Sequence, residues 1–452
     1  DAYIQGVYYD TSGDAGTAGQ VLSSTATGTN WISGIGATSL NGLSDSLVTG
    51  DNIFLGQDPT ATIGSSNNNT SVGINSLSII TTGDGNTVMG RDAGVAVTEG
   101  GYNTLYGHNA GESITTGGYN TLIGYNAGKS IVDSNGNIVL GWGSADLTAV
   151  DVQNQIVIGN SAGRYLDTFK QNICIGNGSA ALLTTGGWNT LVGYNAGNKL
   201  ITGSDNTLIG SEAGEVLTGS DNTLVGRVAG NKMTTGGDSV LIGNEAGKLL
   251  TTGTRNIAIG SKALQNVNAG SNNVAIGYNA LAQQNLGSPG LSANNTVVGY
   301  SAGSIITSGT QNVFLGYSTG TVVTSGSNNT LLGYNAEPSG TAAVNQIIIG
   351  HGALGHGDNI TVIGNTSNTA IHAAGDNTTD LGSPSYSFKD SYVQGRSNAG
   401  NFKVDALQTA PANATDAGTL GEIRYTSDYI YVCITTGGAG SAAWVRSALT
   451  TW

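Results

Sequence analysis

Charge, proline and cysteine are all scarce in this 452-residue chain, and each shortage excludes a class of protein. Charged residues make up 10% of the sequence, against about 25% in typical globular domains, so a set of ordinary globular domains is not expected. Five prolines and the lack of a Gly-X-Y register exclude collagen. The two cysteines, Cys174 and Cys433, are far apart and cannot form a disulfide framework, so we expect both to be buried, small apolar residues.

Other missing features limit the partners that the chain can have. The formal net charge is −14 and no basic stripe occurs, so nucleic acid is a poor partner. No run of about 18 apolar residues occurs, so we expect no insertion into a membrane. The four histidines (His108, His351, His356 and His372) lack a cysteine or carboxylate cluster that would complete a metal site, and we expect no metal or cofactor. Because the chain begins at Asp1 rather than Met, we expect a processed or truncated piece.

Glycine, in contrast, is abundant at 73 residues, and much of it recurs at a fixed period. One recurring glycine, here called the pivot, marks the repeat: fourteen of the eighteen gaps between pivots are 17 residues, and the others are 18, 16, 22 and 14. The 22-residue gap contains Ser288-Pro289-Gly290, which we expect to form a loop outside the coil. Such a period predicts about nineteen stacked coils. The pivots are Gly56, Gly73, Gly90, Gly107, Gly124, Gly141, Gly159, Gly176, Gly193, Gly210, Gly226, Gly243, Gly260, Gly277, Gly299, Gly316, Gly333, Gly350 and Gly364.

Each repeat has the pattern of a strand, a turn, a second short strand and a turn. Apolar triplets such as 156–158 favour strand, while recurrent glycine opposes helix by about 1 kcal/mol each. Asn lies four residues before the pivot in 15 of 19 coils, which predicts a ladder of stacked amides. Ala lies three residues after the pivot in 13 coils, which indicates a tight corner. The repeat therefore predicts an all-β fold, a parallel β-solenoid with about 17 residues per coil.

The strand before each pivot is apolar on both of its faces. The residue two before the pivot is apolar in 18 of 19 coils, Ser71 being the exception, and the residue one before it is apolar in all 19. Successive side chains point to opposite faces, so both faces must be buried: one inside the coil and the other against a neighbour. That neighbour is either another copy of the chain or a covering layer of the same chain, and the lack of predicted helices for such a layer favours another copy. Which face lies inside stays open. We expect the residues two before the pivot to be buried, among them Leu122, Leu191, Leu208, Leu224, Leu331 and Ile348.

The repeat core Asn-x-x-Ile-Gly-x-x-Ala, as in residues 256–263 and 273–280, resembles the head repeats of trimeric autotransporter adhesins. This resemblance implies a left-handed parallel β-roll that assembles as a homotrimer. The usual spacing in that family is shorter, and only the step from Gly350 to Gly364 matches it, so a larger cross-section is expected here.

Segments outside the repeat resemble tail fibres of bacteriophages, marine ones especially. They are residues 16–24 with Trp31, 40–45, 381–392 and 418–425. The resemblance implies a structural and adhesive protein of the virion, extracellular and without enzymatic activity. Its partners would be itself, other tail proteins at the N-terminal end and a host-surface receptor, with glycans among the candidates. The chain divides into an N-terminal β segment or connector (1–51), a solenoid shaft (52–379) and a C-terminal β tip module (380–452).

The tip carries the non-repeating aromatic and charged residues. Residues 422–425 and 429–433 indicate a hairpin, and 444–446 a further strand. Aromatic and arginine side chains are the usual anchors of recognition. The alternative, which the sequence leaves open, is that these residues form the tip's own trimer core. The candidate receptor-binding residues are Tyr425, Tyr429, Tyr431, Trp444, Arg424, Arg446 and Asp428.

Other functions that fit a solenoid remain as alternatives. The first is a bacterial trimeric adhesin or extracellular filament subunit at the cell surface. A tailspike depolymerase would need paired acids about 5–9 Å apart in a groove. An ice-binding solenoid would use threonine pairs such as Thr115-Thr116, although threonine also favours strand edges.

Several motifs that could mark a site have a simpler interpretation. Ser161 and Ser301 lie in Gly-x-Ser-x-Gly, but other coils have Asn or Glu at this position, so both are expected to be corner residues. Asp205 and Asp221 resemble calcium-binding β-roll positions but lack the nonapeptide register. The aromatic residues after the pivot either cover a turn or stack on sugars; they are Tyr125, Trp142, Tyr194, Tyr278, Tyr300, Tyr317 and Tyr334.

Overall fold

A computed structural model describes most of the repeat and parts of both ends. The chain divides into two compact units, residues 1–369 and 370–452, which are described separately. None of the described residues is helical. The described residues are 20–25, 28–33, 46–56, 59–61, 64–145, 153–166, 171–287, 291–368, 411, 423–425, 429–435 and 443–448.

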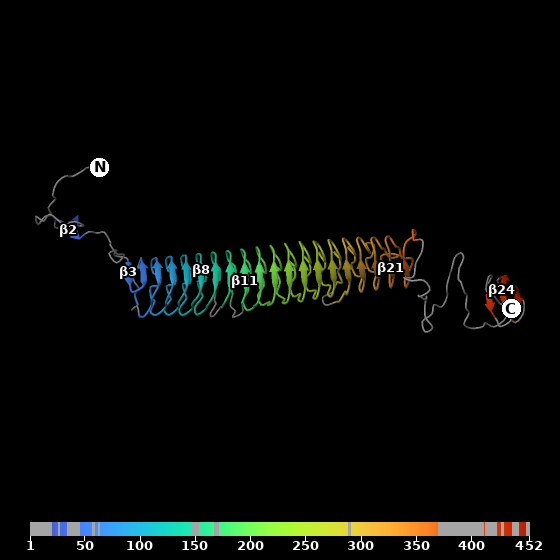
Figure 1. Ribbon diagram of the computed structural model, residues 1–452, viewed down its shortest axis with the longest axis horizontal. Helices are drawn as coiled ribbons and strands as arrows, with labels where there is room; N and C mark the ends of the chain where they lie inside the picture. The colour runs from blue at the N-terminus through green and yellow to red at the C-terminus, as the bar shows by residue number, and fades with distance from the viewer. Residues whose placement is uncertain are drawn as a thin grey trace, which may run out of the picture. The chain divides into compact units, whose positions relative to one another are not determined.

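One long ladder of strands organises the repeat (Figure 1). It starts with an antiparallel pair, β3 (Ser46–Thr49) and β4 (Asn52–Leu55), and continues with parallel three-residue strands. These are β5 (Thr70–Val72), β6 (Thr87–Met89), β7 (Thr104–Tyr106), β8 (Thr121–Ile123), β9 (Ile138–Leu140), β10 (Ile156–Ile158), β11 (Ile173–Ile175), β12 (Thr190–Val192), β13 (Thr207–Ile209), β14 (Thr223–Val225), β15 (Val240–Ile242), β16 (Ile257–Ile259), β17 (Val274–Ile276), β18 (Thr296–Val298), β19 (Val313–Leu315), β20 (Thr330–Leu332), β21 (Ile347–Ile349) and β22 (Thr361–Ile363).

The register is the same at every step of the ladder, which confirms the predicted parallel β-solenoid of 17-residue coils. Thr121 pairs with Ile138 across a 17-residue step, and Val274 pairs with Thr296 across the 22-residue step. The extra residues of the long coil are therefore accommodated outside the sheet. The expected loop at 288–290 lies outside the described residues.

The pivot glycines form one tight column, as predicted. Gly124 has φ +140°, and a Cβ placed on it would lie 2.2 Å from the carbonyl oxygen of Gly141 in the next coil. Both the backbone conformation and the close approach exclude any larger residue.

The core of the shaft lies between two stacked columns of apolar side chains. One column is the residue two before each pivot; Leu122, Leu208 and Ile348 are fully buried there, which confirms the prediction and places this face inside the coil. The alanines three after the pivot are also buried. Ser71 is the one polar member of the first column, and its hydroxyl oxygen is hydrogen-bonded to that of Ser76 at 2.5 Å. The second column is the residue seven after thirteen of the pivots: Ile80, Val97, Ile114, Ile131, Leu166, Leu183, Leu200, Leu217, Met233, Leu250, Val267, Ile306 and Val323.

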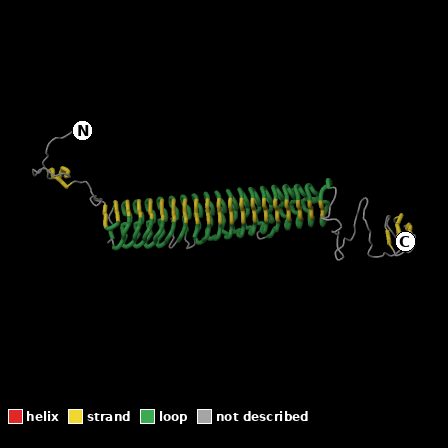
Figure 2. The backbone as a smooth tube through the Cα atoms, in the orientation of Figure 1, coloured by secondary structure: helices red, strands yellow, loops and turns green. Residues whose placement is uncertain are grey.

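The predicted second strand of each coil is wrong. Figure 2 shows strands along one side of the shaft and loops around the rest of each coil. The reason is local: after the pivot, left-handed residues such as Asn126 (φ 55°) and Gly128 (φ 56°) bend the chain before it can extend again. Coils are still joined there by backbone hydrogen bonds, for example from Thr98 N to Thr115 O at 3.1 Å.

The predicted asparagine ladder is present and buried. The side-chain oxygen of Asn103 accepts hydrogen bonds from the backbone N (3.0 Å) and Nδ2 (3.1 Å) of Asn120, and Asn120 Nδ2 also donates to Ser134 O (2.8 Å). Where Ser239 replaces asparagine, its hydroxyl accepts from Asn256 N at 3.2 Å. The ladder satisfies buried backbone donors, so its role is structural.

Short antiparallel strands are described on either side of the shaft sequence. In the first unit β1 (Gln20–Thr25) pairs with β2 (Gly28–Ser33). In the second unit β23 (Ile423–Tyr425), β24 (Tyr429–Thr435) and β25 (Ala443–Ala448) form a sheet in that order, called here the tip sheet. Cys433 and Trp444 are its buried centre, with Tyr431 packed against them. Cys174, within the shaft, is also buried, and neither cysteine forms a disulfide.

Candidate functional site

The outer face of the shaft sheet is an apolar surface open to solvent. The residue one before the pivot lies on this face, opposite the core, because the strand alternates. The residue three before the pivot lies beside it and is Thr, Ile or Val in β5–β22. Thirteen large hydrophobic side chains of these two positions are 37 to 54% exposed: Met89, Tyr106, Ile123, Ile138, Ile209, Ile242, Ile257, Ile259, Val313, Leu315, Leu332, Ile347 and Ile363. We call this surface the outer apolar face.

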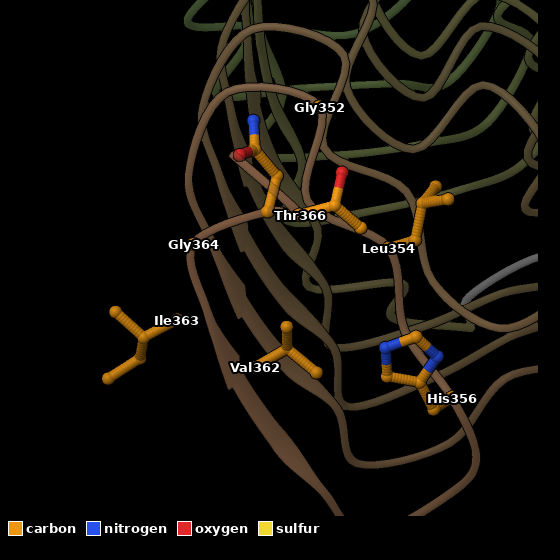
Figure 3. Close-up of a pocket in the computed structure, with 8 residues that line it drawn as sticks. Gly352, Leu354, His356, Val362, Ile363, Gly364 and Thr366 are labelled. Carbon is orange, nitrogen blue, oxygen red and sulfur yellow. The ribbon is translucent and has the colours of Figure 1, made fainter. Parts of the chain in front are cut away.

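The C-terminal end of the shaft has a hollow of about 370 Å³ (Figure 3). Val362 points into the last coil and Ile363 away from it, and His356 and Leu354 lie on the far side of the hollow. Val362 is only partly buried, although it stands in the core column, because β22 pairs only with β21 among the described strands. The described lining comes from residues 352–356 and 362–366, so the hollow lies at the last described coil of the shaft.

The aromatic residues that follow the pivot stack on one another from coil to coil. Tyr300 lies 5.0 Å from Tyr317 between ring centres, Tyr317 lies 5.2 Å from Tyr334, and the planes differ by 7° or less. Tyr125 and Trp142 form a second, looser stack, at 6.3 Å. Because the ring faces meet each other, a sugar could reach only the ring edges within a stack. This geometry favours the interpretation that these rings cover a turn.

The first threonine of each pair proposed for ice binding is hydrogen-bonded within the shaft. Thr81, Thr184 and Thr234 each donate through the side-chain hydroxyl to a backbone carbonyl of the next coil, at 3.0 to 3.1 Å. Thr115 and Thr116 donate instead to the carboxylate of Asp133, and these two bonds hold the pKa of Asp133 below its ordinary value. Hydroxyls engaged in this way strengthen the coil and offer little to a flat ice surface.

The corner positions also follow the simpler interpretation. Ser161 and Ser301 have φ of 51° and 52°, in the same left-handed corner as Asn126 and Glu245. Asp205 and Asp221 are likewise left-handed turn residues, with φ of 58° and 61°. Among the residues that the structure describes, no three His, Cys, Asp or Glu side chains gather where they could hold a metal ion.

The tip sheet brings five of the seven predicted receptor-binding residues to one face. The aligned pairs place Arg424, Tyr431 and Arg446 in one row across the three strands, and Trp444 in the row beside it. Tyr429 shares this face because it lies two residues from Tyr431 on β24.

The other two predicted residues are not part of this group. Tyr425 ends β23 and is aligned with Ile430, and Asp428 lies outside the described residues. The alternation of aromatic and apolar residues along 429–433 was the signal for the strands. No sequence signal specified which residues of β25 would lie opposite them.

Comparisons with known proteins give no family for the chain. A scan against protein-family models and a search of curated proteins both found no match. No helix able to cross a membrane occurs in the described part of the chain.

Proposed function

We propose that this chain is a structural and adhesive fibre protein of a bacteriophage tail. In this proposal the shaft is a left-handed solenoid that assembles as a homotrimer, and the C-terminal tip module binds a receptor on the host surface. The N-terminal segment joins other tail proteins, and the whole assembly is part of an extracellular virion. Three identical tips would gain avidity by binding the same surface together.

The outer apolar face is the observation that carries the proposal. Soluble monomers rarely expose a continuous apolar patch of more than a few hundred Å². Burying a fully exposed Leu or Ile side chain contributes about 1.5–3 kcal/mol. Burying thirteen side chains that are roughly 40% exposed would therefore contribute on the order of 10 kcal/mol per chain. A column in which the residue one before the pivot is apolar in every coil suits parallel copies of the same chain. The number three comes from the resemblance to trimeric heads.

Charged substitutions on the outer apolar face test the assembly. We expect the double variant Ile209→Asp, Ile242→Asp to remain folded but to sediment as a 45.3-kDa monomer, whereas the unchanged chain sediments at three times that mass. Asn244→Asp, at an exposed position outside the strand, is the matched control and should stay trimeric. Leu208→Asp places the charge in the core and should unfold its coil instead. A double variant that remains a stable trimer would refute the proposed interface.

Attachment tests the second half of the proposal. Removing 380–452 should abolish binding to cells in a panel of marine bacteria, provided that sedimentation shows a trimer. Deleting the 17 residues 186–202, one coil in register, should leave binding intact because every coil offers the same surface. A trimer without 380–452 that still binds these cells would place the receptor site elsewhere.

A further inference from the structure

One corner of the shaft lacks the side chain that its two neighbouring coils carry there. The second residue after the pivot is Asn126, Gly143 and Ser161 in three successive coils, with φ of 55°, 58° and 51°. The backbone of this corner is joined from coil to coil: Gly143 N donates to Tyr125 O and Ser161 N to Trp142 O, both at 2.9 Å. Gly143 therefore keeps the fold of the corner and removes only its side chain.

The missing side chain leaves a hollow of about 200 Å³. A Cβ placed on Gly143 would have no neighbouring atom within 4 Å. Gly178 occupies the same corner position in another coil, but a Cβ there would meet the side chains of Asn195 and Asn198. The space at Gly143 is therefore not a general result of glycine at this corner. The described lining of the hollow is Tyr125, Asn126, Trp142, Gly143, Ser161 and Arg164.

Polar groups stand on both sides of Gly143. Asn109 Nδ2 donates to Asn126 Oδ1 at 3.1 Å, but Gly143 offers no side-chain oxygen to Asn126 Nδ2 in the next coil, and no other described residue accepts from it. On the far side, Ser161 Oγ donates to Asn160 Oδ1 at 2.9 Å, and a hydroxyl oxygen that donates can still accept. The hollow thus has a donor on one side and an acceptor on the other, on backbones about 10 Å apart across two coil steps.

An aromatic ring at the end of a stack borders the hollow. His108 stacks on Tyr125 at 5.4 Å and Tyr125 on Trp142 at 6.3 Å, and the next coil has Asn160 in the position of the rings. Trp142 is therefore the last ring of this stack, and it is 55% exposed. Rings within a stack have an aromatic neighbour on each side, whereas Trp142 has one on one side only. Its indole offers an apolar surface next to the two polar groups.

We propose that the hollow at Gly143 binds one pyranose ring of a saccharide. A pyranose has C–H groups on its faces and hydroxyls around its rim, so it would pack on Trp142, accept from Asn126 Nδ2 and donate to Ser161 Oγ. A volume of about 200 Å³ is below that of sites for drug-sized ligands, which limits the site to about one ring. This site lies on the shaft and goes beyond the proposed role of the tip. Since one ring binds weakly, on the order of 1 mM, the site would add to attachment by the tip rather than replace it.

Filling the hollow tests the proposal without removing a structural group. Binding of methyl glycosides of glucose, galactose and N-acetylglucosamine to the whole chain is measured by saturation-transfer NMR, and we expect at least one to bind. Gly143→Asn should remain folded, because Asn126 has the same left-handed backbone and an added Cβ meets nothing. The new amide would fill the hollow and accept from Asn126 Nδ2. We therefore expect an unchanged or higher denaturant midpoint and binding weakened at least about tenfold.

Removing the ring is the second test. Trp142→Asn should also fold, since Asn160 and Asn177 occupy this position in later coils, and should weaken binding at least about tenfold. Tyr317→Asn is the matched control: Tyr317 has the same position but lies between Tyr300 and Tyr334 within the other stack, so binding should not change.

Three results would overturn the inference. The first is that none of the methyl glycosides binds. The second is that a folded Gly143→Asn binds them as the unchanged chain does; if this variant is unfolded, unchanged binding by Trp142→Asn overturns the inference instead. The third is an equal loss in Tyr317→Asn and Trp142→Asn, which would place the sugar on the tyrosine stack. None of these measurements involves cells, so their failure leaves the proposed role of the tip untouched.

Discussion

Replacing a pivot glycine should break the solenoid at one coil, and Gly210 shows the reason. Its φ of +139° lies in a region that residues with a Cβ rarely adopt. An added Cβ would lie 2.4 Å from the carbonyl oxygen of Gly226, and Gly226 is held in place because its N donates to Ile209 O at 2.7 Å. A strained backbone residue costs about 1–3 kcal/mol, and the contact adds to this. We therefore expect Gly210→Ala to lower the local free energy of unfolding by about 3 kcal/mol or more.

Hydrogen exchange followed by mass spectrometry measures this effect coil by coil. Because each coil contacts only its neighbours, Gly210→Ala should remove protection in residues 193–243 and leave it unchanged in 296–349. Gly340→Ala is the control, since Gly340 has no neighbouring atom within 4 Å of an added Cβ and no left-handed φ. Its effect should stay within about 0.5 kcal/mol. Unchanged protection around residue 210 in Gly210→Ala would refute the tight pivot column.

The other predictions concern a buried thiol and the amide ladder. Burial raises the pKa of the Cys174 thiol from 9.0 to about 12, so iodoacetamide should modify it only after the shaft unfolds; rapid labelling of the native chain at Cys174 would contradict its burial. Above pH 9 this thiol ionises in the unfolded chain but not in the folded one. The free energy of unfolding should therefore fall by up to about 1.4 kcal/mol per pH unit because of Cys174. Denaturant titrations of Cys174→Ala should lack this contribution to the pH dependence. Asn206→Ala removes the acceptor of the hydrogen bond from Asn222 N (3.1 Å) and should destabilise the coil by about 1–3 kcal/mol. Asn206→Ser should cost less, because the hydroxyl of Ser239 already accepts the equivalent hydrogen bond in another coil. Equal denaturant midpoints for Asn206→Ala and the unchanged chain would count against the ladder.

The parts of the shaft that the sequence predicted are those where few residue types fit. The pivot needs glycine because of φ and the carbonyl of the next coil, and the ladder needs a side-chain oxygen that accepts from the next coil, which is Asn in most coils. Such positions vary little along the chain and are visible without a structure. The choice of the inner face was different, since both faces of the strand are apolar. The buried residues seven after the pivot show which face lies inside the coil. The residue type at this position varies, for example Leu200, Met233, Val267 and even Gln284, so the sequence does not mark it clearly.

The tip sheet shows a second limit of sequence reasoning. The alternation in 429–433 predicted strands, but the pairing of β24 with β25 includes a register shift between Cys433 and Thr435. A shift of one residue exchanges the two faces of a strand, and no local pattern encodes it. The grouping of Arg424, Tyr431 and Arg446 therefore follows only from the pairing that the structure shows.

Many polar groups of the described shaft contact the next coil, and this bears on where the proposed recognition would occur. The Asn103 amide, the Thr81 hydroxyl and the Tyr317 ring each contact the equivalent position or backbone one coil away. Among the described residues, the outer apolar face is a large surface that coil stacking leaves exposed, and it suits a second copy. In the tip sheet, by contrast, Arg424 and Arg446 each lie over an aromatic ring, at 4.5 Å, and the side chains do not repeat. The proposed function therefore assigns selective binding to the tip and self-association to the shaft.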